Sequence, residues 1–209
     1  MGLYRWSPNY AVLPPRAGEL RVVDIGVGDD PDFAKELARV FNARCLLVDP
    51  TRRHSSVLEA WCDREPRFEY LQAALGSASG NMPFFESRRD VSGSIFASHR
   101  NIAAGDFERY EVPVVTLDDL VQRMDGRIDV LKIDVEGAEF DVLARARPDT
   151  LRLIGQILVE FHDGTVPEFS RQDRDRAVRP LMAGGFTAIE YNGSDVLFCR
   201  PGSNGRRRT

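Results

Sequence analysis

The chain has 209 residues, of which 43% are hydrophobic and 29% charged, proportions that fit a folded globular domain and exclude a wholly disordered chain. The formal net charge of −4 argues against a protein that binds nucleic acid through its phosphates. No run approaches the roughly 18 apolar residues of a membrane span, and the N-terminus lacks a signal-peptide pattern. Three cysteines without metal-type spacing indicate reduced thiols, so we expect a cytoplasmic protein without a membrane span.

Short apolar runs that predict buried strands alternate along the chain with amphipathic runs that predict helices. We expect strands over residues 20–25, 45–49, 68–71, 129–134, 154–161, 186–191 and 196–200. We expect helices over residues 32–41, 55–62, 137–144 and 171–182, and one more that Thr116 starts with a capping box. This alternation predicts an α/β fold: a mostly parallel seven-stranded sheet with helices on both faces, in a single domain.

The domain limits follow from the same pattern. We expect an N-terminal extension over residues 1–19, the main domain over residues 20–201 and a disordered basic tail over residues 202–209. Residues 76–111 interrupt the alternation because glycines and serines are frequent there, so we predict an inserted hairpin or flap with a mobile loop. His99 lies in this stretch and is a weaker candidate for substrate contact.

The first expected strand leads into a glycine loop, where Gly26 and Gly28 let the backbone turn sharply and approach a ligand. A dinucleotide-binding fingerprint would continue to a third glycine, but Asp29 and Asp30 follow here. Two carboxylates repel a pyrophosphate and suit a ligand with a cationic ammonium and sulfonium. The loop therefore favours S-adenosylmethionine over NAD as the cofactor, with a plain surface turn as the alternative.

Asp49 ends the second expected strand, 25 residues after Asp24 in the first. In this topology an acid at an interval of about 20 residues reaches the ribose hydroxyls of a bound nucleotide. The alternative for Asp49 is a helix cap for the segment that follows it. We assign eight residues to cofactor binding: Asp24, Gly26, Gly28, Asp49, Pro50, Ala74, Leu75 and Asp134.

Lys132 lies inside an expected strand that is covered on both faces, where an unpaired ammonium would lose its charge. We therefore predict that it pairs with an acid on a neighbouring strand, either Asp24 or Glu160. The same strand then delivers Asp134 to the edge of the sheet where ligands bind in open α/β folds, although Asp134 could instead cap the next helix. We expect Glu139, one helical turn further on, at the solvated helix surface.

The fifth expected strand ends in Glu160-Phe161-His162, which places an acid and an imidazole at the same edge as Asp134. We predict that His162 is the proton acceptor and that Glu136, Asp134 and Glu160 complete the catalytic group. Asp134, Glu160 and His162 could also hold a divalent cation, which their spacing does not decide. His54 follows two arginines, and we expect it on the surface.

Residues 131–139 read Leu-Lys-Ile-Asp-Val-Glu-Gly-Ala-Glu, which resembles the signature of the FkbM family of S-adenosylmethionine-dependent methyltransferases. The family's Val-x-Thr-Leu-Asp-x-Leu element resembles residues 114–120, and a subgroup shares Asp-Pro-Thr at residues 49–51. The resemblance extends from about residue 22 to residue 198. The chain departs from the family pattern at Asp30, where the last glycine of the loop is usual.

The resemblance implies a Rossmann-like class I methyltransferase fold and transfer of a methyl group to a hydroxyl of a small molecule. A sugar, a glycolipid or a polyketide-type natural product is the implied acceptor, with no nucleic acid as partner. Two alternatives remain from the residues themselves. One is an NAD(P)-dependent oxidoreductase on the same sheet order, which the missing third glycine disfavours, and the other is a cofactor-binding module without catalysis.

Overall fold

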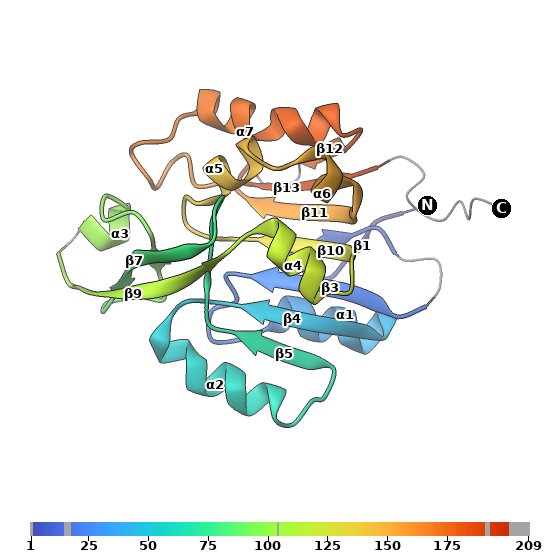
Figure 1. Cartoon of the computed structure of the whole chain (residues 1–209), viewed down its shortest axis with the longest axis horizontal. Helices are drawn as coiled ribbons and strands as arrows, with labels where there is room; N and C mark the ends of the chain where they lie inside the picture. The colour runs from blue at the N-terminus through green and yellow to red at the C-terminus, as the bar shows by residue number, and fades with distance from the viewer. Residues whose placement is uncertain (1, 15–17, 104, 191–192, 201–209) are drawn as a thin grey trace.

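The computed structural model describes residues 2–14, 18–103, 105–190 and 193–200, and a seven-stranded sheet forms its centre (Figure 1). The strands of this sheet are β3 (Leu20–Ile25), β4 (Ala43–Val48), β5 (Phe68–Leu71), β10 (Ile128–Ile133), β11 (Ile154–Glu160), β12 (Thr187–Glu190) and β13 (Asp195–Cys199). In space they follow the order β12-β13-β11-β10-β3-β4-β5. The strands from β11 to β5 are parallel, and β13 is antiparallel to both of its neighbours.

The predicted mostly parallel seven-stranded sheet is therefore confirmed. The predicted tail over residues 202–209 and the last residue of the predicted strand 186–191 lie outside the described residues. No helix in the part of the chain that the structure describes is both long and apolar enough to cross a membrane.

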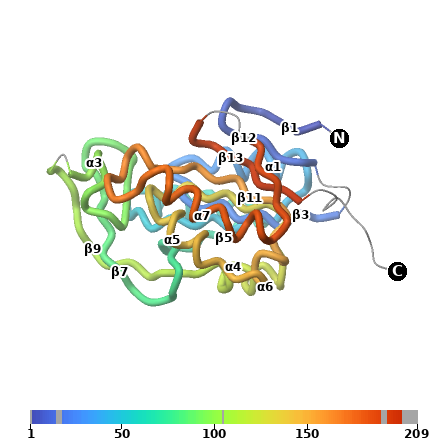
Figure 2. The backbone as a smooth tube through the Cα atoms, turned by 90° about the horizontal axis from the view of Figure 1, so that it is seen from above, coloured from blue at the N-terminus to red at the C-terminus, as the bar shows by residue number. Residues whose placement is uncertain are grey.

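Helices cover both faces of the sheet (Figure 2). The helices are α1 (Asp32–Phe41), α2 (Arg52–Cys62), α3 (Arg100–Ala103), α4 (Leu117–Arg123), α5 (Glu139–Ala144), α6 (Pro148–Arg152) and α7 (Arg171–Ala183). Because successive strand residues point to opposite faces, each face builds its own apolar cluster. Val22 of β3 packs in the cluster with α1 and α2, whereas Val23 packs in the cluster with α4, α5, α6 and α7.

Several elements have the bounds that the sequence predicts, among them β3, α1 and β5. Thr116 and Asp119 form the predicted capping box at the start of α4. The helix α5 begins at Glu139, two residues later than predicted, because Glu136 and Gly137 have φ angles of +53° and +116° and form a turn before it. The helix α6 has five residues and was not among the helices expected from the sequence.

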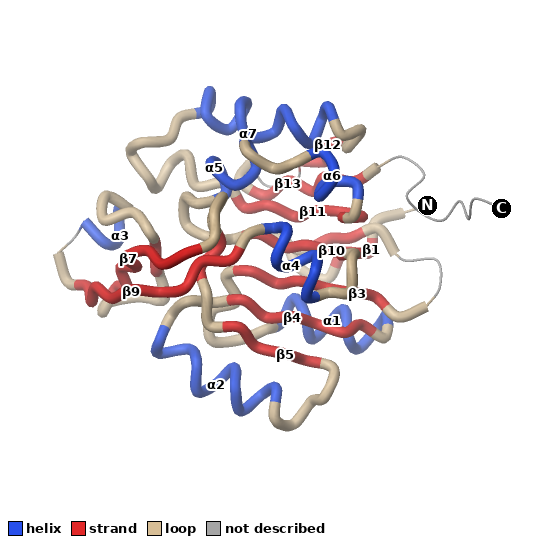
Figure 3. Tube along the Cα trace, viewed as in Figure 1, coloured by secondary structure: helices blue, strands red, loops and turns tan. Residues whose placement is uncertain are grey.

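The stretch over residues 76–111 contains most of a second, four-stranded sheet with the order β6-β9-β7-β8. Its strands are β6 (Ala74–Leu75), β7 (Gly80–Ser87), β8 (Gly93–Ser94) and β9 (Phe107–Val115). The antiparallel pair β7 and β9 extends beyond the carboxyl ends of the central strands (Figure 3). The insertion thus lies above the edge of the sheet where the predicted site residues gather.

The N-terminal extension contains a small antiparallel hairpin of β1 (Tyr4–Arg5) and β2 (Ala11–Val12). The aromatic rings of Trp6 and Tyr10 pack on Phe33 of α1, with centroid distances of 5.6 Å and 5.3 Å. The amide side chain of Gln156 in β11 bonds both to the backbone N–H and to the carbonyl of Leu13. The hairpin therefore packs on the α1 face of the sheet.

Candidate cofactor and catalytic site

A cavity of about 290 Å³ lies at the carboxyl ends of β3, β4 and β10. Residues of the insertion, including Val91, Gly93 and Ile95, line it from the other side, and Tyr10 reaches it from the N-terminal hairpin. Seven of the eight residues predicted to bind the cofactor line this cavity: Gly26, Gly28, Asp49, Pro50, Ala74, Leu75 and Asp134. The eighth, Asp24, is not among the lining residues and is only 1% exposed.

The glycine loop after β3 depends on its glycines for two different reasons. Gly26 and Gly28 both have left-handed φ angles, +74° and +71°. A Cβ atom on Gly26 would lie 1.5 Å from the carbonyl oxygen of Asp134, whereas a Cβ atom on Gly28 would meet nothing within 4 Å. Gly26 therefore allows the ends of β3 and β10 to approach each other, and Gly28 lines an open part of the cavity.

Asp30, which stands where the family pattern has a glycine, is not among the cavity-lining residues. Its backbone has no positive φ, so this position requires no glycine. Its carboxylate lies 2.5 Å from the Lys35 ammonium on the exposed side of α1. The departure from the family pattern thus leaves the cavity wall intact.

Asp49 is a buried carboxylate in the cavity wall. Its Oδ2 accepts a hydrogen bond from the backbone N–H of Gly28 at 2.9 Å, and its Oδ1 accepts one from that of Thr51 at 2.8 Å. Burial raises the pKa of Asp49, but these donors and the nearby His54 outweigh burial and hold the pKa below its usual value. The N-cap residue of α2 is Thr51. Asp49 therefore does not cap that helix, which was the alternative role that the sequence allowed. Asp49 is thus a charged acceptor within the cavity.

Lys132 connects the two central strands at the floor of the cavity, which its side chain helps to line. It lies opposite Asp24 in the register of β10 and β3, and its Nζ is 3.4 Å from Asp24 Oδ1 and 3.3 Å from Asp134 Oδ2. Nζ also donates a hydrogen bond to the carbonyl of Gly26 at 2.8 Å. The prediction that Lys132 pairs with an acid of a neighbouring strand is confirmed, with Asp24 as the partner.

Burial raises the pKa of Asp24 to about 6, although the Lys132 charge acts against this rise. Burial lowers the pKa of Lys132, but Asp24 and Asp134 outweigh it and raise the pKa above the usual value. The lysine therefore keeps its charge inside the sheet and ties the glycine loop to β10.

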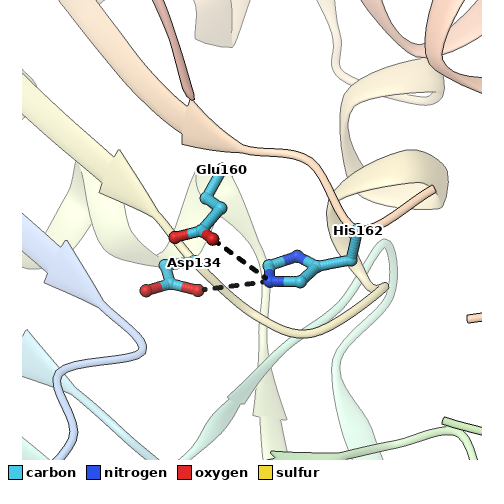
Figure 4. Close-up of side chains that lie close together, drawn as sticks. All are labelled: Asp134, Glu160 and His162. Atoms are coloured by element: carbon cyan, nitrogen blue, oxygen red, sulfur yellow. Dashed lines mark ion pairs between the residues drawn. The ribbon is translucent and has the colours of Figure 1, made fainter. Parts of the chain in front are cut away.

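The predicted catalytic residues come together around the His162 ring. Its Nε2 lies 3.4 Å from Glu136 Oε2, 3.7 Å from Asp134 Oδ1 and 4.0 Å from Glu160 Oε1. Figure 4 shows the carboxylates of Asp134 and Glu160 pointing toward the same ring nitrogen. Asp134 and Glu160 meet because each follows by one residue the registered pair Ile133–Val159 of the parallel strands β10 and β11. The N-cap residue of α5 is Ala138, so Asp134 does not cap that helix.

The predicted place of Glu139 on the solvated helix surface is wrong. Its side chain is fully buried, and its Oε1 accepts a hydrogen bond from the His162 backbone N–H at 2.8 Å and lies 3.1 Å from His162 Nδ1. Its Oε2 accepts a hydrogen bond from the Gly137 N–H at 2.9 Å. The turn at Glu136 and Gly137 comes directly before α5, and the first residue of that helix, Glu139, holds the His162 backbone and ring.

The predicted surface position of His54 is also wrong, since its side chain is 2% exposed and lines the cavity. The structure places it in the first turn of α2, with Nδ1 3.6 Å from Asp49 Oδ1. His99 is buried as well, and its Nε2 lies 2.7 Å from Glu136 Oε2. His99 therefore contacts the predicted catalytic group through Glu136. One sequence signal could have predicted that His54 lies at the cavity: it follows Asp49 by five residues, across the turn from β4 to α2.

The carboxylates also set the charge of the site. Burial lowers the pKa of His162, but the hydrogen bond and charge of Glu139, with the charges of Glu136 and Asp134, raise it to about 10. Burial and the charge of Asp134 raise the pKa of Glu160 to about 7. At neutral pH the imidazole is therefore protonated, while Glu160 exchanges its proton in the range where most enzymes operate.

The same group is also a candidate site for a divalent cation, which would bind His162 only after the ring has lost its proton. Asp134, Glu160 and His162 each offer one ligand atom, and these three atoms lie within 4.8 Å of one another. Carboxylate oxygens and an imidazole nitrogen are common ligands of divalent ions. The structure thus brings together the three residues whose sequence spacing did not decide whether they bind a cation.

Among curated proteins, the chain is 25% identical over 154 residues to the 2-O-methyltransferase NoeI of Sinorhizobium fredii (strain NBRC 101917 / NGR234). This alignment covers 68% of the chain and 63% of NoeI, so the chain spans less than two thirds of that relative's length.

Two fibrillarins are distant structural neighbours. The pre-rRNA processing fibrillarin of Methanococcus jannaschii has a TM-score of 0.47 and 13% identity, over 94% of this chain and 69% of its own. Fibrillarin of Aeropyrum pernix, with natively bound S-adenosyl-L-methionine, has a TM-score of 0.48 and 13% identity, over 88% of this chain and 67% of its own.

The family comparison covers most of the chain. The model of the methyltransferase FkbM domain matches residues 7–186, which include the whole cavity wall and the His162 group. The strand order and the antiparallel β13 agree with the fold that the resemblance implied. The chain therefore belongs to the FkbM methyltransferase domain family and has its Rossmann-like class I methyltransferase fold.

Proposed function

We propose that this chain is an S-adenosylmethionine-dependent O-methyltransferase that acts on a hydroxyl of a small molecule. One observation carries the proposal: a single cavity joins the glycine loop and Asp49 on one side to Asp134 and Glu136 on the other. The family membership supports methyl transfer, and the name of the relative NoeI, a 2-O-methyltransferase, supports oxygen as the acceptor atom. A sugar, a glycolipid or a polyketide-type product is the acceptor class that we propose.

The residues present fit S-adenosylmethionine. The cavity, about 290 Å³, is near the lower limit of ligand pockets, which begin at about 300 Å³. Asp49 offers a charged acceptor for ribose hydroxyls. The described lining residues include the carboxylates of Asp29, Asp49, Asp134 and Glu136 against the ammonium of Lys132, and this excess of negative charge suits a cationic ligand. When bound, S-adenosylmethionine supplies a methyl group on a sulfonium.

Glu160 is the proton acceptor that the charge distribution favours. A general base works best when its pKa is near the operating pH, and the pKa of Glu160 is raised to about 7. The sequence favoured His162 for this role, but the surrounding carboxylates raise its pKa to about 10 and keep it protonated. In the proposed mechanism His162 stays an imidazolium that Glu139 orients, and it holds the carboxylates of Glu136, Asp134 and Glu160 around its ring. Glu136 and Asp134 line the cavity, and Glu160 lies behind them, on the far side of Asp134 from the glycine loop.

Alignment contributes more than the base in this proposal. Holding two reactants in line lowers a barrier by about 7–11 kcal/mol, whereas one general base gives about 10²–10⁴-fold. Damage to the cofactor side of the cavity should therefore cost more activity than loss of Glu160. Asp29 in the cavity wall argues against the alternative, an NAD(P)-dependent oxidoreductase, because the charge of the Asp29 carboxylate would repel the pyrophosphate of that cofactor.

Isothermal titration with S-adenosylhomocysteine and NAD tests the proposed cofactor. We expect S-adenosylhomocysteine to bind and Asp49→Asn to weaken it by about 10–100-fold, since a hydrogen bond to a charged group is worth about 1.5–3 kcal/mol. Asp63→Asn, the same change at an exposed position near the other end of α2, is the matched control and should bind as the wild type does. Undiminished binding in Asp49→Asn, or binding of NAD alone, would contradict the proposal. Binding without transfer to any hydroxylated acceptor would favour the module without catalysis.

The cation at Asp134, Glu160 and His162 is a separate proposal with its own test. If a divalent ion activates the acceptor hydroxyl, a chelator abolishes turnover and added Mg²⁺ or Mn²⁺ restores it. Turnover that a chelator leaves unchanged would assign the proton transfer to the side chains alone.

A further inference from the structure

The cavity wall contains a buried histidine that the proposed mechanism does not use. His54 is 2% exposed, and neither of its ring nitrogens has a hydrogen-bond partner within the described residues. The backbone of His54 is fixed at the cavity wall, because its N–H bonds to the Thr51 carbonyl in the first turn of α2. Buried polar side-chain atoms almost always have a partner, so an unpaired imidazole in a ligand cavity indicates that a ligand supplies one.

The neighbour of His54 restricts what that ligand group can be. The nearest charged atom is Asp49 Oδ1, 3.6 Å from His54 Nδ1, and Asp29 lies in the same cavity wall. These carboxylates would repel a phosphate or carboxylate placed against the imidazole. A neutral hydroxyl meets no such repulsion and can both donate and accept a hydrogen bond.

We propose that His54 and Asp49 together bind the vicinal hydroxyls of the cofactor's ribose, with His54 as the hydrogen-bond donor. This inference rests on the proposed function, because it places the ribose beside Asp49. An ionised carboxylate can only accept hydrogen bonds, and each oxygen of Asp49 already accepts one from the backbone. Asp49 therefore accepts hydrogen bonds from the hydroxyls, while the imidazole N–H donates one to a hydroxyl oxygen. Together the two side chains select a nucleoside with both hydroxyls over a deoxynucleoside.

The test uses isothermal titration of the full chain with S-adenosylhomocysteine, adenosine, 2′-deoxyadenosine and 3′-deoxyadenosine. In the wild type we expect one deoxynucleoside to bind at least about 10-fold more weakly than adenosine. In His54→Leu, which keeps the bulk but has no donor, we expect weaker S-adenosylhomocysteine binding and a smaller deoxy penalty at the hydroxyl that His54 contacts, while the part of the penalty that comes from Asp49 remains. His54→Asn retains a donor and should restore part of the penalty. Ser55→Ala, the next residue, whose hydroxyl bonds the Arg52 carbonyl away from the cavity, is the control.

The outcomes separate this inference from the proposed function. If the wild type binds no S-adenosylhomocysteine, the proposed function fails and this inference fails with it. If S-adenosylhomocysteine binds and Asp49→Asn weakens it, but His54→Leu keeps the wild-type deoxy penalty, only this inference is overturned. It is also overturned if His54→Leu weakens all ligands by one factor, because His54 then acts only by packing against Asp49. If His54→Leu does not fold, His54→Ala, which also has no donor, takes its place, and an unchanged penalty for both hydroxyls in that variant overturns the inference.

Discussion

Replacement of Lys132 by methionine tests the ionic link at the floor of the cavity. Lys132 is buried between Asp24 and Asp134, and its removal leaves the Asp24 carboxylate, 1% exposed, without a cation. Asp134 is about a quarter exposed and can be solvated, so Asp24 carries most of the loss. The Gly26 carbonyl also loses its donor, the Lys132 ammonium.

The expected loss follows from the burial of both partners. Removing one member of a buried ion pair costs about 3–5 kcal/mol, whereas replacing both members costs far less. For a chain of this length each 1 kcal/mol lowers the melting temperature by about 2–4 °C, so Lys132→Met should melt roughly 6–20 °C below the wild type. The double variant Asp24→Asn/Lys132→Met should recover most of this loss, because no charge remains buried alone.

Thermal and urea unfolding at pH 5 and pH 8 measure both effects. Burial raises the pKa of Asp24 to about 6 in the folded chain, from a usual value of 3.8. The folded chain therefore binds this proton more tightly than the unfolded chain does. The stability that this proton contributes is lost as the pH rises through about 6. Without Lys132 this loss grows, and the deficit of Lys132→Met should be larger at pH 8 than at pH 5. A single variant within about 1 kcal/mol of the wild type at pH 8, or a double variant as unstable as the single one, would refute the reasoning.

Two further predictions concern the reaction and the loop. Because the pKa of Glu160 is raised to about 7 and only its deprotonated form accepts a proton, the methyl transfer rate should rise with pH through about 7. Glu160→Gln should lose that rise and lower kcat by about 10²–10⁴-fold, and a rate profile that keeps its shape in this variant would remove Glu160 as the base. Gly26→Ala should destabilise the chain more than Gly28→Ala in urea unfolding, since both have a left-handed φ but only a Cβ on Gly26 meets the Asp134 carbonyl oxygen. Equal losses of stability in the two variants would show that backbone strain alone acts there.

The features that the sequence predicted correctly depend on residues close together in the chain or on the direction of parallel strands. The bounds of β3 and α1 follow from the spacing of apolar residues within each element, and the cap at Thr116 follows from a residue three positions later. Gly26 and Asp49 meet at the cavity because parallel strands deliver their carboxyl ends to one edge of the sheet. The pairing of Lys132 with Asp24 follows from the same strand order, because a lysine buried in the sheet needs an acid on a neighbouring strand.

The positions that only the tertiary structure decided depend on turns and on contacts between distant segments. The direction of Glu139 is set by the positive φ angles before α5, and its partner His162 lies 23 residues further along the chain. His54 is buried because its helix begins against the cavity wall, a place that its arginine neighbours did not indicate. Local pattern thus determined which strands end at the site. The tertiary packing determined which side chains face it, because a side chain's direction and burial depend on segments that the local sequence does not contain.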